Sequence, residues 1–354
     1  MLYQTENQHG GDVYGGGITL DFSANTNPLG TPPGVLEAVC RALPRLHRYP
    51  DPYCRRLVQA IAGHEQVPAS YILCGNGAAD LIYTYCAALW PRTAVELAPT
   101  FVEYGAGLAQ VGCRVERYFL HQAQNFDLDE RFLSFLEEKK PEGVFLCNPN
   151  NPTGRLIPLP LLEQILQYCA AQGVRLFLDE CFLDLTEDGV SAKSLLAAHP
   201  ELLILKAFTK SYGMAGIRLG YCLCADNALL RRMAAASPPW NVSSPAQSAG
   251  VAALAGRDFL QRTLSLVHTE RRWLTDNLTA LGFWVCPSHA NYLLFRGPLW
   301  LREGLLQQGI AIRGCGNYNG LGDGWYRIAV RPHGENEALI TAIRQFCKEK
   351  SLWQ

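Results

Sequence analysis

The chain has 354 residues, 48% of them hydrophobic and 18% charged, so it can bury a sizeable core without disulfide or metal staples. This composition excludes collagen, coiled coils and wholesale disorder, and at about 150 residues per domain the length predicts two domains, or one with an appendage. The 31 basic and 32 acidic residues give a formal charge of −1. No overall field would therefore attract nucleic acid or an anionic membrane, and we expect neither as a partner.

The 13 cysteines do not fit a secreted disulfide scaffold, because such scaffolds are short and an odd count leaves one thiol unpaired. We therefore expect a cytoplasmic protein. Cys222 and Cys224 share one face of an expected strand, which favours buried apolar roles over metal binding, and we expect no metal. Residues 1–17 are polar and glycine-rich, unlike a signal peptide, and no apolar run reaches membrane-spanning length.

From residue 71 onward, short β-rich runs alternate with helical stretches. The expected strands are 71–74, 93–98, 114–119, 143–147, 174–179, 202–208 and 218–224, and the clearest helix between them is 159–172. This alternation predicts the α/β class, with a mostly parallel sheet covered by helices.

The order of elements changes after a long amphipathic stretch, 258–281, which ends at Gly282. There follow strands at 283–286 and 291–296, a helix at 299–308, strands near Ile310 and Trp325, and a helix at 335–348. We expect a smaller α+β domain here. The predicted parts are an N-terminal segment (1–45) that packs with the small domain and the active site, a large domain (46–250) and a small domain (251–354).

Ligands of open α/β sheets bind beyond the carboxyl ends of the strands, where this chain places polar residues. Lys210 follows one strand in a polar turn, where it could form a Schiff base with a carbonyl cofactor or be a surface lysine. Asp179 ends a largely apolar strand, where its charge needs a cationic partner. The protonated ring nitrogen of pyridoxal phosphate is such a partner, and a helix N-cap is the alternative role.

A cofactor phosphate would need backbone amides and a cation. The turn Gly75-Asn76-Gly77 opens a helix after a strand and supplies amides, while Thr209 could add a hydroxyl and Arg218 a charge. Asn151 could donate to the phenolate oxygen of the ring, or be an ordinary turn residue. Phe101 could stack on the ring, or belong to the core.

Several motifs, in their order and spacing, make the chain resemble fold-type I pyridoxal phosphate enzymes of the histidinol-phosphate aminotransferase group. They are Arg48-Tyr-Pro-Asp-Pro, Asn150-Asn-Pro-Thr-Gly, Leu178-Asp-Glu-Cys-Phe, Phe208-Thr-Lys-Ser-Tyr-Gly-Met-Ala-Gly-Ile-Arg-Leu-Gly and Tyr326-Arg-Ile-Ala-Val-Arg. Within that group the chain is most similar to the threonine-phosphate decarboxylases of cobalamin biosynthesis. The features shared with them are His9-Gly-Gly, Asp21-Phe-Ser-Ala-Asn-Thr-Asn-Pro-Leu-Gly, Gly75-Asn-Gly and Ile312-Arg-Gly-Cys-Gly-Asn-Tyr-Asn-Gly-Leu.

The resemblance implies pyridoxal 5'-phosphate as cofactor and a homodimer with a shared active site. Lys210 would carry the cofactor, Asp179 would pair with the ring nitrogen, and Asn151 would contact both the phenolate oxygen and the substrate. The other implied cofactor contacts are Phe101 on the ring, Gly77, Ala78, Thr209 and Arg218 on the phosphate, and Tyr49 reaching that phosphate from the neighbouring subunit.

The substrate implied by the resemblance is a phosphorylated amino acid. Arg327 would hold its carboxylate, while His9, Asn25 and Arg313 would face its phosphate, with Arg331 as the alternative phosphate ligand. The chain departs from many relatives at two positions: Phe182 replaces a tyrosine that touches the phenolate oxygen, and Ala207 replaces a serine or threonine.

Three functions follow. The first is a lyase that converts L-threonine O-3-phosphate to (R)-1-amino-2-propanol O-2-phosphate and carbon dioxide. The second is an aminotransferase for a phosphorylated amine such as histidinol phosphate. The third is a binding or regulatory relative without activity, which the presence of both Lys210 and Asp179 disfavours. The residues alone do not choose between decarboxylation and transamination, nor between threonine phosphate and serine phosphate.

Overall fold

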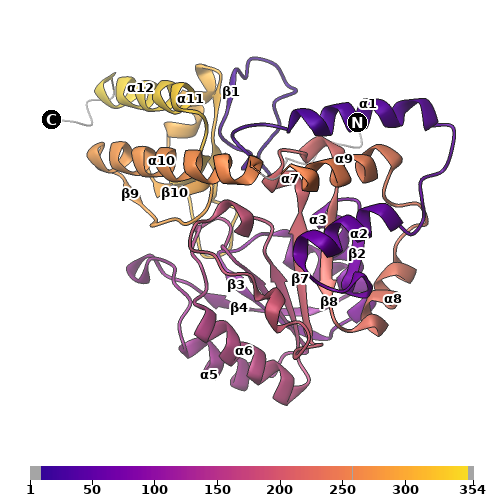
Figure 1. Ribbon diagram of the computed structural model, residues 1–354. Helices are drawn as coiled ribbons and strands as arrows, with labels where there is room; N and C mark the ends of the chain where they lie inside the picture. The colour runs from indigo at the N-terminus through magenta and orange to yellow at the C-terminus, as the bar shows by residue number, and fades with distance from the viewer. Residues whose placement is uncertain (1–8, 257, 350–354) are drawn as a thin grey trace.

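The computed structural model of the protein describes residues 9–256 and 258–349, so the first eight residues of the polar segment 1–17 lie outside the described part. A seven-stranded sheet forms the larger body, and a four-stranded sheet with its own helices lies beside it (Figure 1). No helix in the described residues is long and apolar enough to span a bilayer.

The large sheet has the strand order β2-β8-β7-β6-β5-β3-β4. Its strands are β2 (Ile72–Gly75), β3 (Thr93–Ala98), β4 (Arg114–Phe119), β5 (Gly143–Cys147), β6 (Arg175–Asp179), β7 (Leu202–Ala207) and β8 (Gly220–Cys224). Strand β8 runs antiparallel to β2 and β7, and the other neighbours are parallel. The predicted α/β class with a mostly parallel sheet is confirmed.

Side chains that alternate along each strand bury two separate apolar layers. Leu176 and Leu178 of β6 pack on one side of the sheet, and Phe177 packs on the other. The first layer is covered by α2 (Arg55–Glu65), α5 (Arg131–Lys139), α6 (Leu159–Gln172) and α9 (Ser244–Ala255), and the second by α3 (Ala78–Leu89), α4 (Glu103–Gln110) and α8 (Asn227–Ala236). Helix α1 (Pro33–Ala42) lies against α9.

Cys222 and Cys224 are buried together in the layer beneath α3, α4 and α8, so they share a face as predicted. Among the described residues, no group of histidine, cysteine, aspartate and glutamate side chains is arranged to hold a metal ion.

The smaller sheet is antiparallel, in the order β12-β13-β10-β9, and confirms the predicted α+β part. It consists of β9 (Trp284–Val285), β10 (Tyr292–Arg296), β12 (Arg313–Gly314) and β13 (Trp325–Ala329), and it packs with α10 (Phe259–Ala280), α11 (Leu301–Gln307) and α12 (His333–Glu349). The N-terminal strand β1 (Leu20–Asp21) pairs with β11 (Ile310–Ala311), and Phe22 enters the same core. The domain limits at residues 45 and 250 stay a prediction.

Lys210 does not lie in the turn that we expected. Strand β7 ends at Ala207, and α7 (Phe208–Ser211) forms a single helical turn that carries this lysine. The strand expected over 218–224 begins at Gly220, because Arg218 has a left-handed backbone with φ of 59°. Short 3₁₀ helices cover Leu43–Arg45, Ala69–Tyr71, Gln122–Gln124, Leu183–Leu185, Ala192–Leu195 and Ala215–Ile217.

Candidate active site

A cavity of about 370 Å³ lies at the carboxyl ends of β5, β6 and β7, where parallel sheets bind their ligands. It brings together most of the residues predicted from sequence, although they come from widely separated segments. Those residues are His9, Asn25, Ala78, Phe101, Asn151, Asp179, Thr209, Lys210, Arg218, Arg313 and Arg327. Gly77 lies just outside the lining, and Tyr49 lies elsewhere.

Lys210 is the candidate nucleophile at the floor of the cavity. Its Nζ lies 5.5 Å from the centre of the Phe182 ring. Burial, together with the charges of Arg327 and Arg218, lowers the pKa of Lys210 to about 8. The unprotonated fraction of this amine near neutral pH is therefore much larger than that of an ordinary lysine, which favours a nucleophilic role.

Asp179 is buried at the end of β6 and makes two hydrogen bonds. Its Oδ2 accepts from the Tyr104 hydroxyl at 2.6 Å, and its Oδ1 accepts from the Cys181 amide at 2.8 Å. Burial raises the pKa of Asp179, and these hydrogen bonds oppose that rise. Within the described residues no cation forms an ion pair with the carboxylate, so the site fits a cationic ring nitrogen supplied by a ligand.

The N-terminus of α3 forms the candidate phosphate site. Gly77 has φ of 89°, and a Cβ at this residue would lie 2.8 Å from Nη2 of Arg218. The arginine therefore packs against the glycine, beside the first amides of the helix. The positive end of a helix and a guanidinium favour an anion. The Asn76 and Gly77 amides, which the sequence predicted for the phosphate, already donate to Oδ2 of Asp80 and to the Gly75 carbonyl. Ala78 and Thr209 also line the cavity.

Arg327 and Asn151 form a buried pair that lines the cavity. Nη1 of Arg327 donates to Oδ1 of Asn151 at 2.5 Å, and Nη2 donates to the Ser23 carbonyl at 2.9 Å. Nε of Arg327 and both polar side-chain atoms of Asn25 are buried without a partner in the described structure. Because unpaired buried donors are costly, Nε of Arg327 and Nδ2 of Asn25 fit an anionic ligand, which can accept a hydrogen bond from each.

The loop that carries Asn151 is held by its neighbour Asn150. Nδ2 of Asn150 donates to the Pro99 carbonyl at 3.0 Å, and its Oδ1 accepts from the Thr100 hydroxyl at 2.8 Å. The Tyr292 hydroxyl donates to the Asn150 carbonyl at 3.0 Å. These bonds connect the loop to β3 and β10 and fix the position of Asn151.

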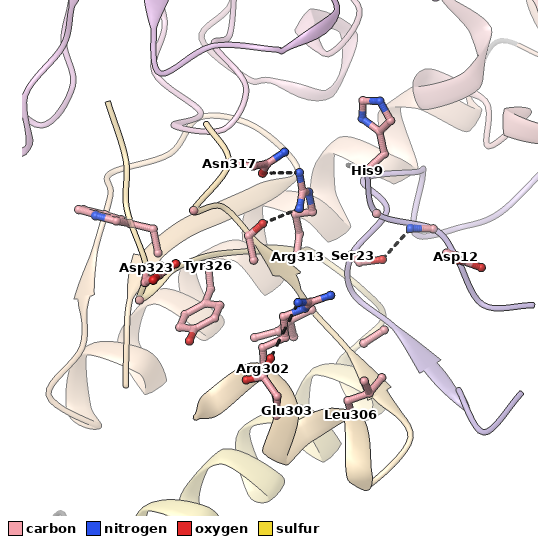
Figure 2. A pocket seen from close by; sticks show the side chains of 18 of the residues that line it. His9, Asp12, Ser23, Arg302, Glu303, Leu306, Arg313, Asn317, Asp323 and Tyr326 are labelled. Atoms are coloured by element: carbon pink, nitrogen blue, oxygen red, sulfur yellow. Dashed lines mark hydrogen bonds and ion pairs between the residues drawn. The ribbon is translucent and has the colours of Figure 1, made fainter. Parts of the chain in front are cut away.

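Arg313 lies where the cavity adjoins a wider hollow of about 890 Å³, shown in Figure 2. Its Nη2 donates to Oδ1 of Asn317 at 2.7 Å, and its guanidinium lies 5.5 Å from the centre of the Tyr318 ring. Arg331, the alternative phosphate ligand, lines neither space. It forms an ion pair with Glu335 at 2.9 Å, so the structure disfavours that alternative.

His9 enters the cavity from the N-terminal segment and contacts a residue that the sequence did not suggest. Its Nε2 lies 2.8 Å from Oε1 of Glu103, and the Tyr83 hydroxyl donates to Oε2 of the same carboxylate at 2.6 Å. Tyr104 was also missed. Both Glu103 and Tyr104 closely follow Phe101 at the start of α4. Their closeness in sequence to Phe101, a predicted site residue, is the signal that could have identified them.

Tyr49 is 77% exposed and stacks on Trp240, with ring centres 4.4 Å apart. It does not line the cavity of its own chain. Its predicted contact with the cofactor phosphate requires a second subunit and stays a prediction.

The sequence profile of the family "Aminotransferase class I and II" matches residues 18–346. The chain belongs to this family. A threonine-phosphate decarboxylase from Salmonella typhimurium is 40% identical over 92% of this chain and 90% of its own length. The resemblance predicted from the motifs is thereby confirmed.

Solved structures of the family share the fold. A histidinol-phosphate aminotransferase from Clostridium acetobutylicum has a TM-score of 0.87 and 28% identity, covering 93% of this chain and 99% of that one. Another, from Sinorhizobium meliloti, was solved in complex with pyridoxal-5'-phosphate. It has a TM-score of 0.82 and 23% identity, covering 93% of this chain and 92% of its own. The predicted fold type I is confirmed.

The close approach of β8 to α3 gives a prediction about the phosphate site. A Cβ at Gly220 would lie 2.8 Å from the Ala78 amide nitrogen, so Gly220→Ala displaces the start of α3. We expect the affinity for pyridoxal phosphate, measured by fluorescence titration, to fall about tenfold or more, as when a charged hydrogen bond is lost. Gly63→Ala on α2, where a Cβ meets no atom within 4 Å, is the control and leaves the affinity unchanged. Unchanged affinity in Gly220→Ala would contradict this account of the site.

Proposed function

We propose that the protein is a pyridoxal phosphate-dependent decarboxylase that converts L-threonine O-3-phosphate to (R)-1-amino-2-propanol O-2-phosphate and carbon dioxide, for cobalamin biosynthesis. The observation that carries the proposal is the 40% identity, along almost the whole chain, to a threonine-phosphate decarboxylase. The geometry supports it, because one cavity contains a lysine with a lowered pKa, a buried carboxylate and two arginines suited to two anionic groups.

The cofactor site uses residues already placed in the cavity. Asp179 would hold the ring nitrogen, Phe101 would cover the ring, and the start of α3 with Thr209 and Arg218 would hold the phosphate. When bound, pyridoxal phosphate supplies an acceptor for the electron pair left on the α-carbon after a bond to it breaks. Phe182 offers no hydroxyl to the ring, which leaves Asn151 as the proposed contact of the phenolate oxygen.

The substrate has two anionic groups, and the chain offers a separate arginine for each. Arg327 is buried and held at Asn151 and Ser23, so its guanidinium has a fixed orientation suited to a carboxylate. Arg313 lies nearer the wider hollow, where it would meet the phosphate together with His9 and Asn25. Nδ2 of Asn25 and Nε of Arg327, which have no partner in the described structure, would donate to the anionic groups of such a substrate.

These residues also select the bond that breaks. Arg327 would fix the carboxylate and Arg313 the phosphate, so the bound substrate has little freedom to rotate. One substituent of the α-carbon is therefore presented for cleavage. Loss of carbon dioxide leaves the α-carbon needing a proton. Lys210 is the group placed to deliver it, and its lowered pKa suits an amine that must both accept and donate protons near neutral pH.

The active form in this proposal is a homodimer in the cytoplasm. Tyr49 and Trp240 form an exposed aromatic pair, and Tyr49 would reach the cofactor phosphate of the second subunit. A reducing compartment suits the chain, because all 13 of its cysteines are free thiols.

An aminotransferase acting on histidinol phosphate is the alternative, since solved relatives with this fold include such enzymes. Both activities need Lys210, Asp179 and a phosphate-binding arginine, and they differ in the bond broken. The products therefore decide between them.

The first test measures those products. The purified protein loaded with pyridoxal phosphate is incubated with threonine phosphate and no keto acid, and carbon dioxide and aminopropanol phosphate are quantified. We expect equal amounts of both, over many turnovers. No carbon dioxide, together with amino-group transfer from histidinol phosphate once a keto acid is added, would refute the decarboxylase and establish the alternative.

The second test concerns Lys210. After incubation with pyridoxal phosphate and borohydride reduction, mass spectrometry should find the cofactor on the peptide that contains Lys210. Lys210→Ala should lose both this adduct and the visible absorption band, whereas Lys139→Ala, which changes a helix-end lysine remote from the cavity, should keep both. An adduct on another lysine in the unmodified protein would refute the assignment.

The third test separates the two arginines. Arg327→Ala removes the carboxylate contact, so it should reduce the decarboxylation of threonine phosphate and of free threonine alike. Arg313→Ala should weaken the phosphorylated substrate, by roughly 10-fold to 100-fold in kcat/KM, and barely affect free threonine. Lysine should restore function in part at 313 and poorly at 327, because a carboxylate fork needs the planar guanidinium. Equal losses for both substrates in Arg313→Ala would contradict this division.

A further inference from the structure

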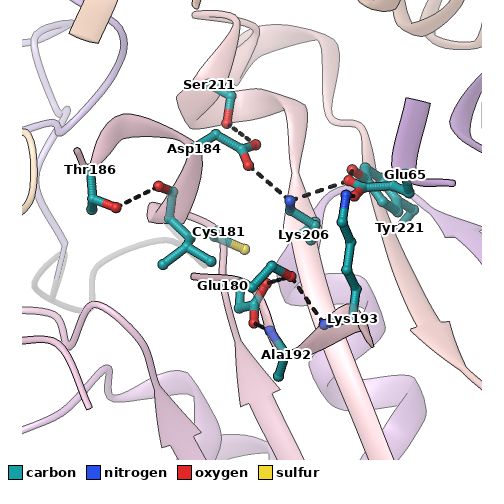
Figure 3. Close-up of polar contacts among 12 residues, drawn as sticks. Glu65, Glu180, Cys181, Asp184, Thr186, Ala192, Lys193, Lys206, Ser211 and Tyr221 are labelled. Carbon is teal, nitrogen blue, oxygen red and sulfur yellow. Dashed lines mark hydrogen bonds and ion pairs between the residues drawn. The ribbon is translucent and has the colours of Figure 1, made fainter. Parts of the chain in front are cut away.

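A cluster of charged side chains surrounds the buried Lys206, and Figure 3 shows its contacts. Lys206 on β7 is 4% exposed, and its Nζ lies 2.8 Å from Oδ1 of Asp184 and 3.2 Å from Oε1 of Glu65. Glu65, at the end of α2, also accepts from Lys193 at 2.8 Å and from the Tyr221 hydroxyl. We call these five residues the Lys206 cluster.

The charges within the cluster balance. Burial opposes the charge on Lys206, but Asp184 and Glu65 raise the pKa of Lys206 above its ordinary value. Burial likewise opposes the charge on Glu65, yet Lys206 and Lys193 lower the pKa of Glu65 to about 2. Two ammonium groups therefore face two carboxylates, and removal of one central partner would leave a buried charge unpaired.

The pleat of the sheet separates this cluster from the cavity. Along β7, Ala207 lines the cavity and the preceding Lys206 points to the opposite face. Along the end of β6, Asp179 faces the cavity, whereas Glu180 accepts hydrogen bonds from Ser191 and from the Ala192 amide. Lys206 is therefore not placed to bind the cofactor, although it lies four residues before Lys210.

The cluster nevertheless touches the helix that carries Lys210. The Ser211 hydroxyl donates to Oδ2 of Asp184 at 2.9 Å, and the Ser211 carbonyl accepts from Nδ2 of Asn27 at 2.7 Å. Consecutive residues of a helix are turned by roughly 100°, so Lys210 can face the cavity while Ser211 faces the cluster. Helix α7 has only one turn, and these contacts at Ser211 hold its C-terminal end.

We propose that Asp184, held by Lys206, is a positioning residue that fixes the direction of Lys210 through the Ser211 hydroxyl. The carboxylate of Asp184 connects the two sides, with one oxygen on the buried ammonium and the other on the residue after Lys210. The inference rests on the proposed role of Lys210. It adds that the orientation of this amine is set by charges on the opposite face of the sheet.

The test compares two variants that each remove one contact of the same cluster. Ser211→Ala breaks the bond to α7 and leaves every charge paired. Lys193→Gln breaks a bond at the far side of Glu65, which keeps Lys206 and Tyr221 as partners. Three quantities are measured on both loaded enzymes: the thermal unfolding midpoint, kcat and KM, and the pH titration of the visible absorbance, which reports protonation of the Lys210 nitrogen.

If Asp184 positions Lys210, Ser211→Ala should lower kcat by about tenfold with little change in KM, because a hydrogen bond to a charged group is lost. The same variant should shift the pH titration of the visible absorbance. Lys193→Gln should lower the unfolding midpoint and leave kcat and the titration unchanged. The inference is overturned if Ser211→Ala matches the unmodified protein in both readouts, or if Lys193→Gln changes both equally.

A second pair of variants tests the ammonium itself. Lys206→Arg keeps a cation that can bond both carboxylates, so it should retain most of kcat and the titration of the visible band. Lys206→Met removes the cation, so it should lower kcat and shift the absorbance titration more strongly than Ser211→Ala does. If Lys206→Met does not fold, Ser211→Ala still decides. Failure of the Lys210 assignment would appear separately, as a borohydride adduct on another lysine.

Discussion

The carboxyl ends of β6 and β7 concentrate charged side chains where helices cover both faces of the sheet, and each buried charge needs a partner. On the face away from the cavity, Lys206 meets this need with Asp184 and Glu65. On the cavity face the need is only partly met: Asp179 has hydrogen bonds from Tyr104 and Cys181, but in the described part of the chain no cation forms an ion pair with it. The site is thus built to be completed by a ligand that brings the missing charges.

Around Lys210, by contrast, the lining of the cavity carries more positive than negative charges. Arg218, Arg313 and Arg327 line it together with this lysine, whereas the carboxylates in the lining are Asp179 and Glu103. Excess positive charge attracts phosphate and carboxylate groups, and it also disfavours a proton on the buried amine. The same electrostatics therefore select anionic ligands and leave Lys210 more readily unprotonated.

The sequence was sufficient to predict the strand ends that carry Asp179, Asn151 and Lys210, because buried strands of β-rich residues followed by polar residues are visible in a single chain. It could not reveal their partners. Tyr104, Glu103 and Asp184 carry no distinctive local pattern, and their contacts depend on how helices pack across the sheet. The one-turn helix α7 was taken for a turn because four residues are too few for helical periodicity.

The N-terminal segment illustrates a second limit. Asn25 and His9 were predicted by resemblance, but the pairing of β1 with β11 that brings the segment to the cavity joins residues far apart in the chain. Asn27 was not predicted, although it holds the Ser211 carbonyl. Tyr49 lies beyond what one chain can show, because its proposed partner belongs to a second subunit.

The central claim is that burial beside arginines lowers the pKa of Lys210. Its most direct test is the pH dependence of amine labelling in the cofactor-free protein, followed residue by residue by mass spectrometry, with the exposed Lys140 as internal reference. Labelling of Lys210 should rise through a midpoint near pH 8, and Arg327→Ala should move this midpoint upward. A midpoint at the ordinary lysine value of 10.5 in the unmodified protein would contradict the claim.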